Sequence, residues 1–94
     1  MDYKRHIEFL ESIQNDRWMI LQLNNTIIGI GKETEFEKLK EPLRLMLKEV
    51  RKTQNPFSLS DGSIVNEKEH KKLLKIIIDI IDLLNDFYGN YKTL

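Results

Sequence analysis

The segment from Asn66 to Tyr88 constrains the fold most, because apolar residues recur at helical spacing along its whole length. Asn66 with Glu69 fits a capping box, and Gly89 is well placed as the C-terminal stop of this helix. The wide apolar face predicts the central helix of a bundle; the alternative is that part of this face, or its aromatic end at Phe87, Tyr88 and Tyr91, meets a partner protein. The face includes Leu73, Leu74, Ile77, Ile78, Ile80, Ile81 and Leu84, and the single polar stripe is made of Lys72, Lys75, Asp79, Asp82 and Asp86.

The segments 2–14 and 34–52 also carry apolar residues at helical spacing, and both are predicted to be helices. In the second segment, Thr34 and Glu37 fit a capping box at the start. Pro42 lies inside this segment, and a proline removes one backbone hydrogen bond from a helix. Two interpretations follow: either the helix kinks, or Pro42 occupies the first turn of a fresh helix.

The segment 17–31 fits two structures. As a helix, it has one face with Trp18, Leu21 and Ile28 and another with Ile20, Leu23 and Ile27. As a hairpin, its apolar residues alternate on either side of a turn at Asn24-Asn25, since asparagine tolerates positive φ. Gly29 and Gly31 are interpreted as the boundary that follows. We expect a helix here.

The segment 55–65 contains Asn-Pro and Asp-Gly, which both signal turns, so it is predicted to be a loop. Its apolar residues suggest that the loop packs down on the helices; they are Phe57, Leu59, Ile64 and Val65. The predicted fold is therefore all-α: a single domain, residues 1–94, forming a small antiparallel bundle of four helices. The alternative is three helices plus a hairpin at 17–31.

The composition argues against several functions. The chain of 94 residues has 15 basic and 15 acidic residues, and this zero net charge argues against a nucleic-acid binder, which needs a basic excess. The absence of cysteine rules out disulfides and thiolate metal sites. The charged N-terminal stretch has no apolar signal-peptide core, and no apolar run approaches the ~20 residues that span a bilayer. We expect a cytoplasmic protein.

No catalytic, cofactor or metal site is predicted. His6 and His70 lie far apart without a metal-ligand spacing, and both are interpreted as surface residues. The serines lack any nucleophile context. We therefore expect a protein that is not an enzyme and has no small-molecule substrate. The acidic stripe residues Asp82 and Asp86 are either solvated or contacts for a partner, because acids near a helix C-terminus oppose the macrodipole by ~0.3–1 kcal/mol each.

The second half of the chain resembles the class IIa, or pediocin-like, bacteriocin immunity proteins. The resemblance covers roughly residues 36–91 and rests on four features. These are a proline followed by an amphipathic helix (Pro42-Leu43-Arg44-Leu45), an Asp-Gly turn (Asp61-Gly62), a polar-capped helix rich in lysine and leucine (Asn66 to Leu73), and a Tyr-Gly near the end (Tyr88-Gly89). The apolar segment 17–31 departs from the family, whose second helix is long and polar.

The resemblance implies an antiparallel four-helix bundle that acts by binding. Such an immunity protein protects a bacteriocin producer by recognising, from the cytoplasmic side, the mannose phosphotransferase permease that the bacteriocin has engaged. The implied recognition region is the loop Asp61–Val65, the last helix and the tail, with Tyr88, Tyr91 and Lys92 as expected contacts. The alternative is a phage or mobile-element accessory protein that binds and inhibits a host protein.

Overall fold

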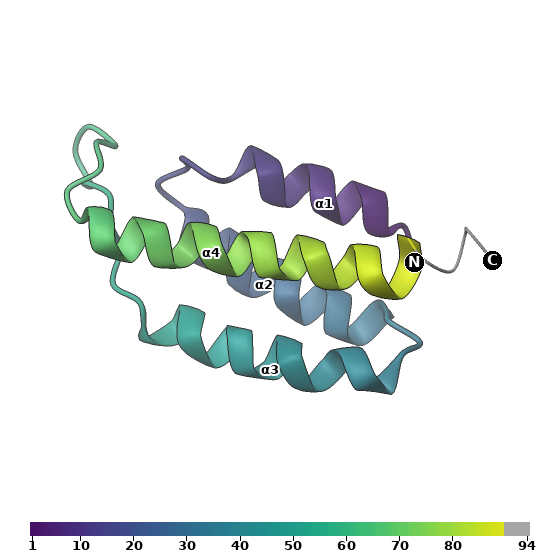
Figure 1. Ribbon diagram of the computed structural model, residues 1–94. Coiled ribbons are helices and arrows are strands. Elements are labelled where there is room, and N and C mark those ends of the chain that lie inside the picture. Colours follow the sequence, from purple (N-terminus) through teal and green to yellow (C-terminus); the bar gives the residue numbers. More distant parts are fainter. Residues whose placement is uncertain (90–94) are drawn as a thin grey trace.

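The computed structural model describes residues 1–89 as an up-down-up-down bundle, with both ends of the described chain at the same end of the molecule (Figure 1). The helices are α1 (Tyr3–Ser12), α2 (Met19–Glu33), α3 (Glu37–Lys52) and α4 (Glu67–Leu84), followed by a π-helical turn, η1 (Asn85–Gly89). Within residues 1–89 no strand forms; an isolated antiparallel bridge joins Phe57 and Ile64. The predicted all-α bundle is confirmed.

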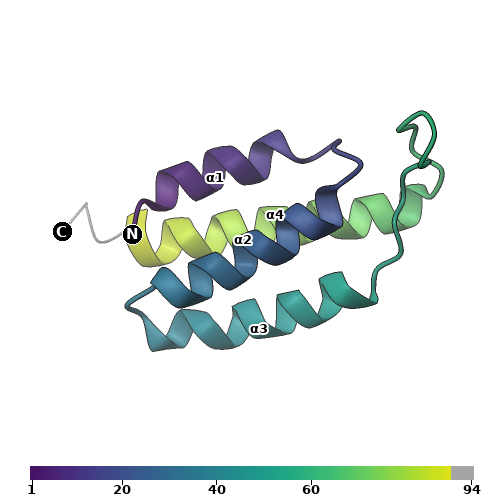
Figure 2. The same cartoon turned by 180° about the vertical axis from the view of Figure 1, so that it is seen from behind.

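The four helices enclose one shared apolar core in an elongated body of 47 × 21 × 19 Å. Helix α2 packs on α3, α1 on α4, and contacts between α3 and α4 and between α1 and α2 complete the bundle (Figures 1 and 2). The short connections 13–18 and 34–36 force α1 and α2, and α2 and α3, to run antiparallel. The side chains that are fully buried come from every helix and include Leu10, Met19, Leu23, Ile30, Leu39, Leu43, Leu73, Ile77, Ile80 and Leu84.

Residues 19–31 of the segment 17–31 belong to α2, so the hairpin alternative is wrong. Met19, Leu23, Ile27 and Ile30 are buried, and their spacing places them on one face of α2. This face packs against the core, which supplies the stabilisation that β-branched residues lack in an isolated helix. The glycines at 29 and 31 lie inside α2 and do not mark its end, because α2 continues to Glu33.

The helix caps agree with the sequence at α4 and differ at α3. Asn66 caps α4 as predicted, and its Oδ1 accepts a hydrogen bond from Glu69 N at 3.2 Å. The predicted capping box at Thr34 is wrong: α3 begins after Phe36, and Thr34 is the C-cap of α2. The Thr34 hydroxyl is occupied elsewhere, since it accepts from Phe36 N at 3.2 Å and pairs with the hydroxyl of Tyr88.

Pro42 lies inside α3, which runs without interruption from Glu37 to Lys52. Pro42 therefore does not begin a fresh helix. The backbone bond that a proline removes is the one to the carbonyl four residues earlier. That carbonyl belongs to Lys38, an exposed residue close to the start of α3, where carbonyl groups are accessible to water.

Helix α4 is the spine of the bundle, with Leu73, Ile77, Ile80 and Leu84 fully buried. Ile78 differs from the prediction: it was assigned to the apolar face, yet 54% of its surface is exposed. The reason is helical geometry, because Ile78 falls near the row of Lys71, Lys75 and Asp82, opposite the core. None of the helices within residues 1–89 combines the length and the apolar composition that crossing a membrane requires.

Candidate functional site

The aromatic end of α4 belongs to the core. The Tyr88 ring stacks on Tyr3 with 5.5 Å between centroids and meets the edge of Phe36 at 5.1 Å. Its hydroxyl lies 2.6 Å from Thr34 Oγ1, in a buried contact that ties η1 to the end of α2. Only 8% of Tyr88 is exposed, so its side chain offers almost no surface to a partner. We therefore exclude Tyr88 from the expected contacts.

The other expected contacts divide into two groups. Asp82 and Asp86 are exposed on α4 and η1 and form no ion pair with any residue in the range 1–89. They differ from Asp79, whose Oδ2 lies 3.1 Å from Lys75 Nζ. Tyr91 and Lys92 lie outside the residues that the structure describes. Of the five expected contacts, the structure therefore leaves the two acids available on the surface.

The α3–α4 loop closes on itself as a tight turn. Ser58 N donates to Ser63 O at 2.8 Å, and Gly62 adopts φ +75°, a conformation that favours glycine. The Asp61 carboxylate accepts a hydrogen bond from Ser63 N at 2.8 Å. Hydrogen bonds from the side chain and backbone of Ser63 lower the pKa of Asp61 below its usual range, so this carboxylate is ionised at the tip of the loop at neutral pH.

The loop presents apolar side chains to solvent, contrary to the expectation that it packs down. Leu59 is 78% exposed, and Ile64 and Val65 are exposed as well. Only Phe57 follows the expectation: it is buried, with its ring 5.4 Å from the ring of His70.

Trp18 adds to the exposed apolar surface at the same end of the bundle. It is 54% exposed at the start of α2, and together with Gly62 it borders a shallow depression. The Arg17 guanidinium lies 5.6 Å above the Trp18 ring, in cation–π range. We call the exposed apolar residues at this end the loop-end surface; they are Trp18, Leu21, Leu59, Ile64 and Val65.

The sequence signal for Trp18 was present but ambiguous. Of the two apolar faces available to a helix at 17–31, the one with Ile20, Leu23 and Ile27 packs inward. The face with Trp18 and Leu21 points outward. Periodicity identified both faces equally well, and only the packing of α2 on its neighbours distinguishes them.

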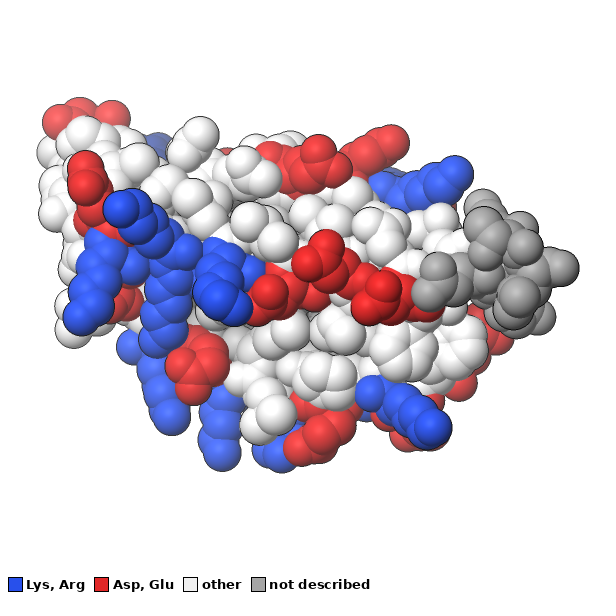
Figure 3. Space-filling model, viewed as in Figure 1, with Lys and Arg blue, Asp and Glu red and all other residues white. Residues whose placement is uncertain are grey.

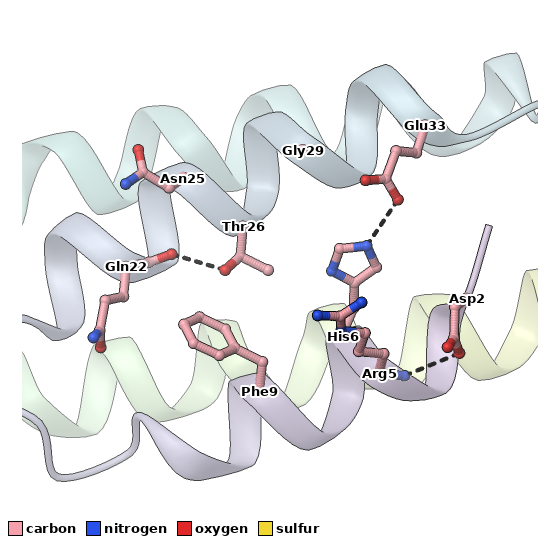
Figure 4. A pocket seen from close by; sticks show the side chains of 9 residues that line it. All are labelled: Asp2, Arg5, His6, Phe9, Gln22, Asn25, Thr26, Gly29 and Glu33. Carbon is pink, nitrogen blue, oxygen red and sulfur yellow. Dashed lines mark hydrogen bonds and ion pairs between the residues drawn. The ribbon is translucent and has the colours of Figure 1, made fainter.

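The two histidines have separate structural roles. His70 is buried, so its interpretation as a surface residue is wrong, and its Nε2 lies 2.8 Å from the carbonyl oxygen of Gln14. The His6 side chain, 21% exposed, pairs with Glu33 at 3.0 Å and links α1 to α2 across an open cleft of about 480 Å³ (Figure 4). Figure 4 shows that the other lining side chains come from α1, α2 and Asp2 and include Arg5, Phe9, Gln22 and Thr26.

The cleft has no arrangement that defines a reaction. Asp2 accepts a hydrogen bond from Arg5 N at 3.3 Å as the cap of α1, and the Thr26 hydroxyl donates to the carbonyl of Gln22 at 2.8 Å. Both groups therefore serve their own helices. Among residues 1–89, no three His, Asp or Glu side chains lie close enough to share a metal ion.

Comparisons with known proteins add no relative. No family model matches this chain, and neither a curated protein nor a solved structure matches it.

Proposed function

We propose that this protein is a cytoplasmic immunity protein that protects a bacteriocin producer. In this proposal it binds the mannose phosphotransferase permease from the cytoplasmic side once a pediocin-like bacteriocin has engaged the permease. The observation that carries the proposal is the loop-end surface, with Leu59, Ile64 and Val65 exposed in a structured turn. This turn lies in the half of the chain that the family resemblance assigns to recognition.

The loop-end surface suits a protein partner for two physical reasons. Apolar side chains grouped at one end of a small bundle lose contact with water when a partner covers them, which favours binding by ~25 cal/mol per Å². Tryptophan and arginine, here Trp18 and Arg17, are the residue types most often found at the energetic centre of an interface. The turn is held by its own hydrogen bonds, so little ordering is needed on binding.

A killing assay tests the proposal. The chain is expressed in a bacteriocin-sensitive strain, and survival is measured against a panel of pediocin-like peptides. We expect protection against at least one peptide, and capture of the permease by the tagged protein only when that peptide is present. Absence of protection against the whole panel contradicts the proposal, and capture of a cytosolic enzyme instead of the permease favours the accessory-protein alternative.

Variants of the loop-end surface test whether this surface is needed for protection against the bacteriocin. Leu59→Ser with Val65→Ser removes exposed apolar groups and leaves the core intact, so we expect lost protection with an unchanged melting temperature. Phe9→Ser is the matched control, because Phe9 is also an exposed apolar residue but lies in the α1–α2 cleft. Equal protection by all three proteins would show that the loop-end surface is not the recognition surface.

A further inference from the structure

The exposed face of α4 carries segregated charges. Basic side chains gather over the half nearest the α3–α4 loop, and acidic side chains follow the other half (Figure 3). Ile78, 54% exposed, lies at the boundary between the two halves. We call this the charged face; it comprises Lys68, Lys71, Lys72, Lys75, Ile78, Asp79, Asp82 and Asp86.

The positions on the charged face are symmetric about residue 77. Lys75, Lys72 and Lys68 precede it by two, five and nine positions, and Asp79, Asp82 and Asp86 follow it by the same two, five and nine. A two-fold axis perpendicular to α4 at this height would therefore bring Lys75, Lys72 and Lys68 to the level of an aspartate of a second copy, while Lys71 corresponds to Leu83. Such a face is complementary to itself, which is what an isologous interface between identical subunits requires.

From this symmetry we infer that the charged face binds a second copy of the chain, with the two α4 helices antiparallel. In this dimer Lys68 faces Asp86 of the second copy, and Lys71 and Lys72 lie beside the second Asp82. The intrachain pair of Lys75 and Asp79 at 3.1 Å meets its symmetry copy at the axis, which gives an alternating cluster of four charges. The inference is independent of the proposed function and uses a different surface.

Apolar contacts complete the interface. Ile78 lies beside the axis, and a shallow groove between α3 and α4 contains Leu45, Met46 and Ile76 next to Lys75. Leu45 is 50% exposed, so it gains contacts when a second copy covers the groove.

The side chains of the charged face that form no ion pair in the monomer support the binding of a second copy. Lys68, Lys71, Asp82 and Asp86 make no ion pair within residues 1–89. These four side chains are therefore free to pair between copies without breaking a contact in the monomer. Their interactions are exposed at the rim, so the association should weaken as added salt shortens the screening length.

Paired charge-reversal variants give the test. Lys68→Glu with Lys71→Glu reverses the two unpaired lysines of the charged face, and Asp82→Lys with Asp86→Lys reverses its two unpaired aspartates. In the dimer of each variant the contacts of residue 68 with residue 86 and of residue 71 with residue 82 become repulsive, and they become attractive again when the two variants are mixed. We expect the dissociation constant of each variant alone to rise about 10-fold or more, and the equimolar mixture to form a heterodimer as readily as the wild type dimerises.

Sedimentation velocity at low and high salt is the measurement, with circular dichroism to verify that each variant is folded. Lys32→Glu with Lys40→Glu is the matched control, because both lysines are exposed outside the charged face, Lys32 in the last turn of α2 and Lys40 beside the α2–α3 groove, and should leave the dimer unchanged. A wild type that stays monomeric at low salt over a wide range of concentrations overturns the inference. So does a mixture of the two variants that fails to associate, or a monomer whose lysines instead bind vesicles of anionic lipid.

Discussion

The contact between Tyr88 and Thr34 allows a quantitative test of the bundle. Their hydroxyl oxygens lie 2.6 Å apart in a buried position, and the contact joins η1 to the junction of α2 and α3. Tyr88→Phe removes one hydroxyl and keeps the ring that stacks on Tyr3. The change therefore isolates one hydrogen bond with little loss of apolar packing.

The expected magnitude follows from the partners that remain. An ordinary intramolecular hydrogen bond contributes ~0.5–1.5 kcal/mol, and a buried group left without any partner costs ~1–3 kcal/mol. After Tyr88→Phe, Thr34 Oγ1 still accepts from Phe36 N at 3.2 Å, so it keeps one partner. We expect a loss of about 1 kcal/mol, which lowers the melting temperature of a domain of this size by ~4–8 °C.

Thermal unfolding followed by circular dichroism measures this loss, and a double-mutant cycle with Thr34→Val assigns it to the pair. Thr34→Val also removes the acceptor of Phe36 N, so it should cost more than Tyr88→Phe. The double variant should cost less than the two single losses combined, because the shared bond is removed only once. Additive losses, or an unchanged melting temperature for Tyr88→Phe, would refute the buried pair.

Three further predictions concern other parts of the molecule. Gly62→Ala should lower the free energy of unfolding by ~1–2 kcal/mol, because φ at this position is +75°. Gly29→Ala should raise it by ~0.5–1 kcal/mol, because Gly29 lies inside α2 with open space for a methyl group. Urea unfolding measures both changes. The lowered pKa of Asp61 stabilises the fold above the unfolded value of ~3.9, and this contribution disappears as the pH falls through the lower folded pKa, so Asp61→Asn should flatten the acid limb of the stability curve. Asp86→Lys should raise the melting temperature of the monomer slightly, because it complements the macrodipole in the last turn, while weakening the dimer in sedimentation.

The sequence predicted best the parts that depend on local chemistry. The cap at Asn66 and the buried row of Leu73, Ile77 and Ile80 follow from residue types and helical spacing alone. Thr34 was misassigned because threonine followed by Glu37 fits a capping box equally well as sequence. The hydroxyl of Tyr88, far away in the chain, determines which hydrogen bond Thr34 makes, and no local pattern contains that information.

The candidate surfaces were predicted less well, for a related reason. Leu59 and Val65 carry the same apolar signal as Phe57, yet only Phe57 reaches the core. Which of them is buried depends on how the turn at Gly62 directs the chain, and on the position of His70 against which Phe57 packs. An apolar side chain tends to be buried, but the core has room for only some of the apolar side chains in the loop.

The charge order of α4 is the reverse of what the helix alone favours. The macrodipole stabilises acids near the N-terminus and bases near the C-terminus, yet after its first turn α4 carries lysines and then aspartates. In a monomer this order has a small cost with no compensating contact for Asp82 and Asp86 among the described residues. In an antiparallel pair each aspartate lies beside a lysine of the second helix, and the two macrodipoles also oppose each other favourably. The same reversed order that is unfavourable in one helix is therefore favourable in two, which is why the charged face is better explained by a second copy than by solvent.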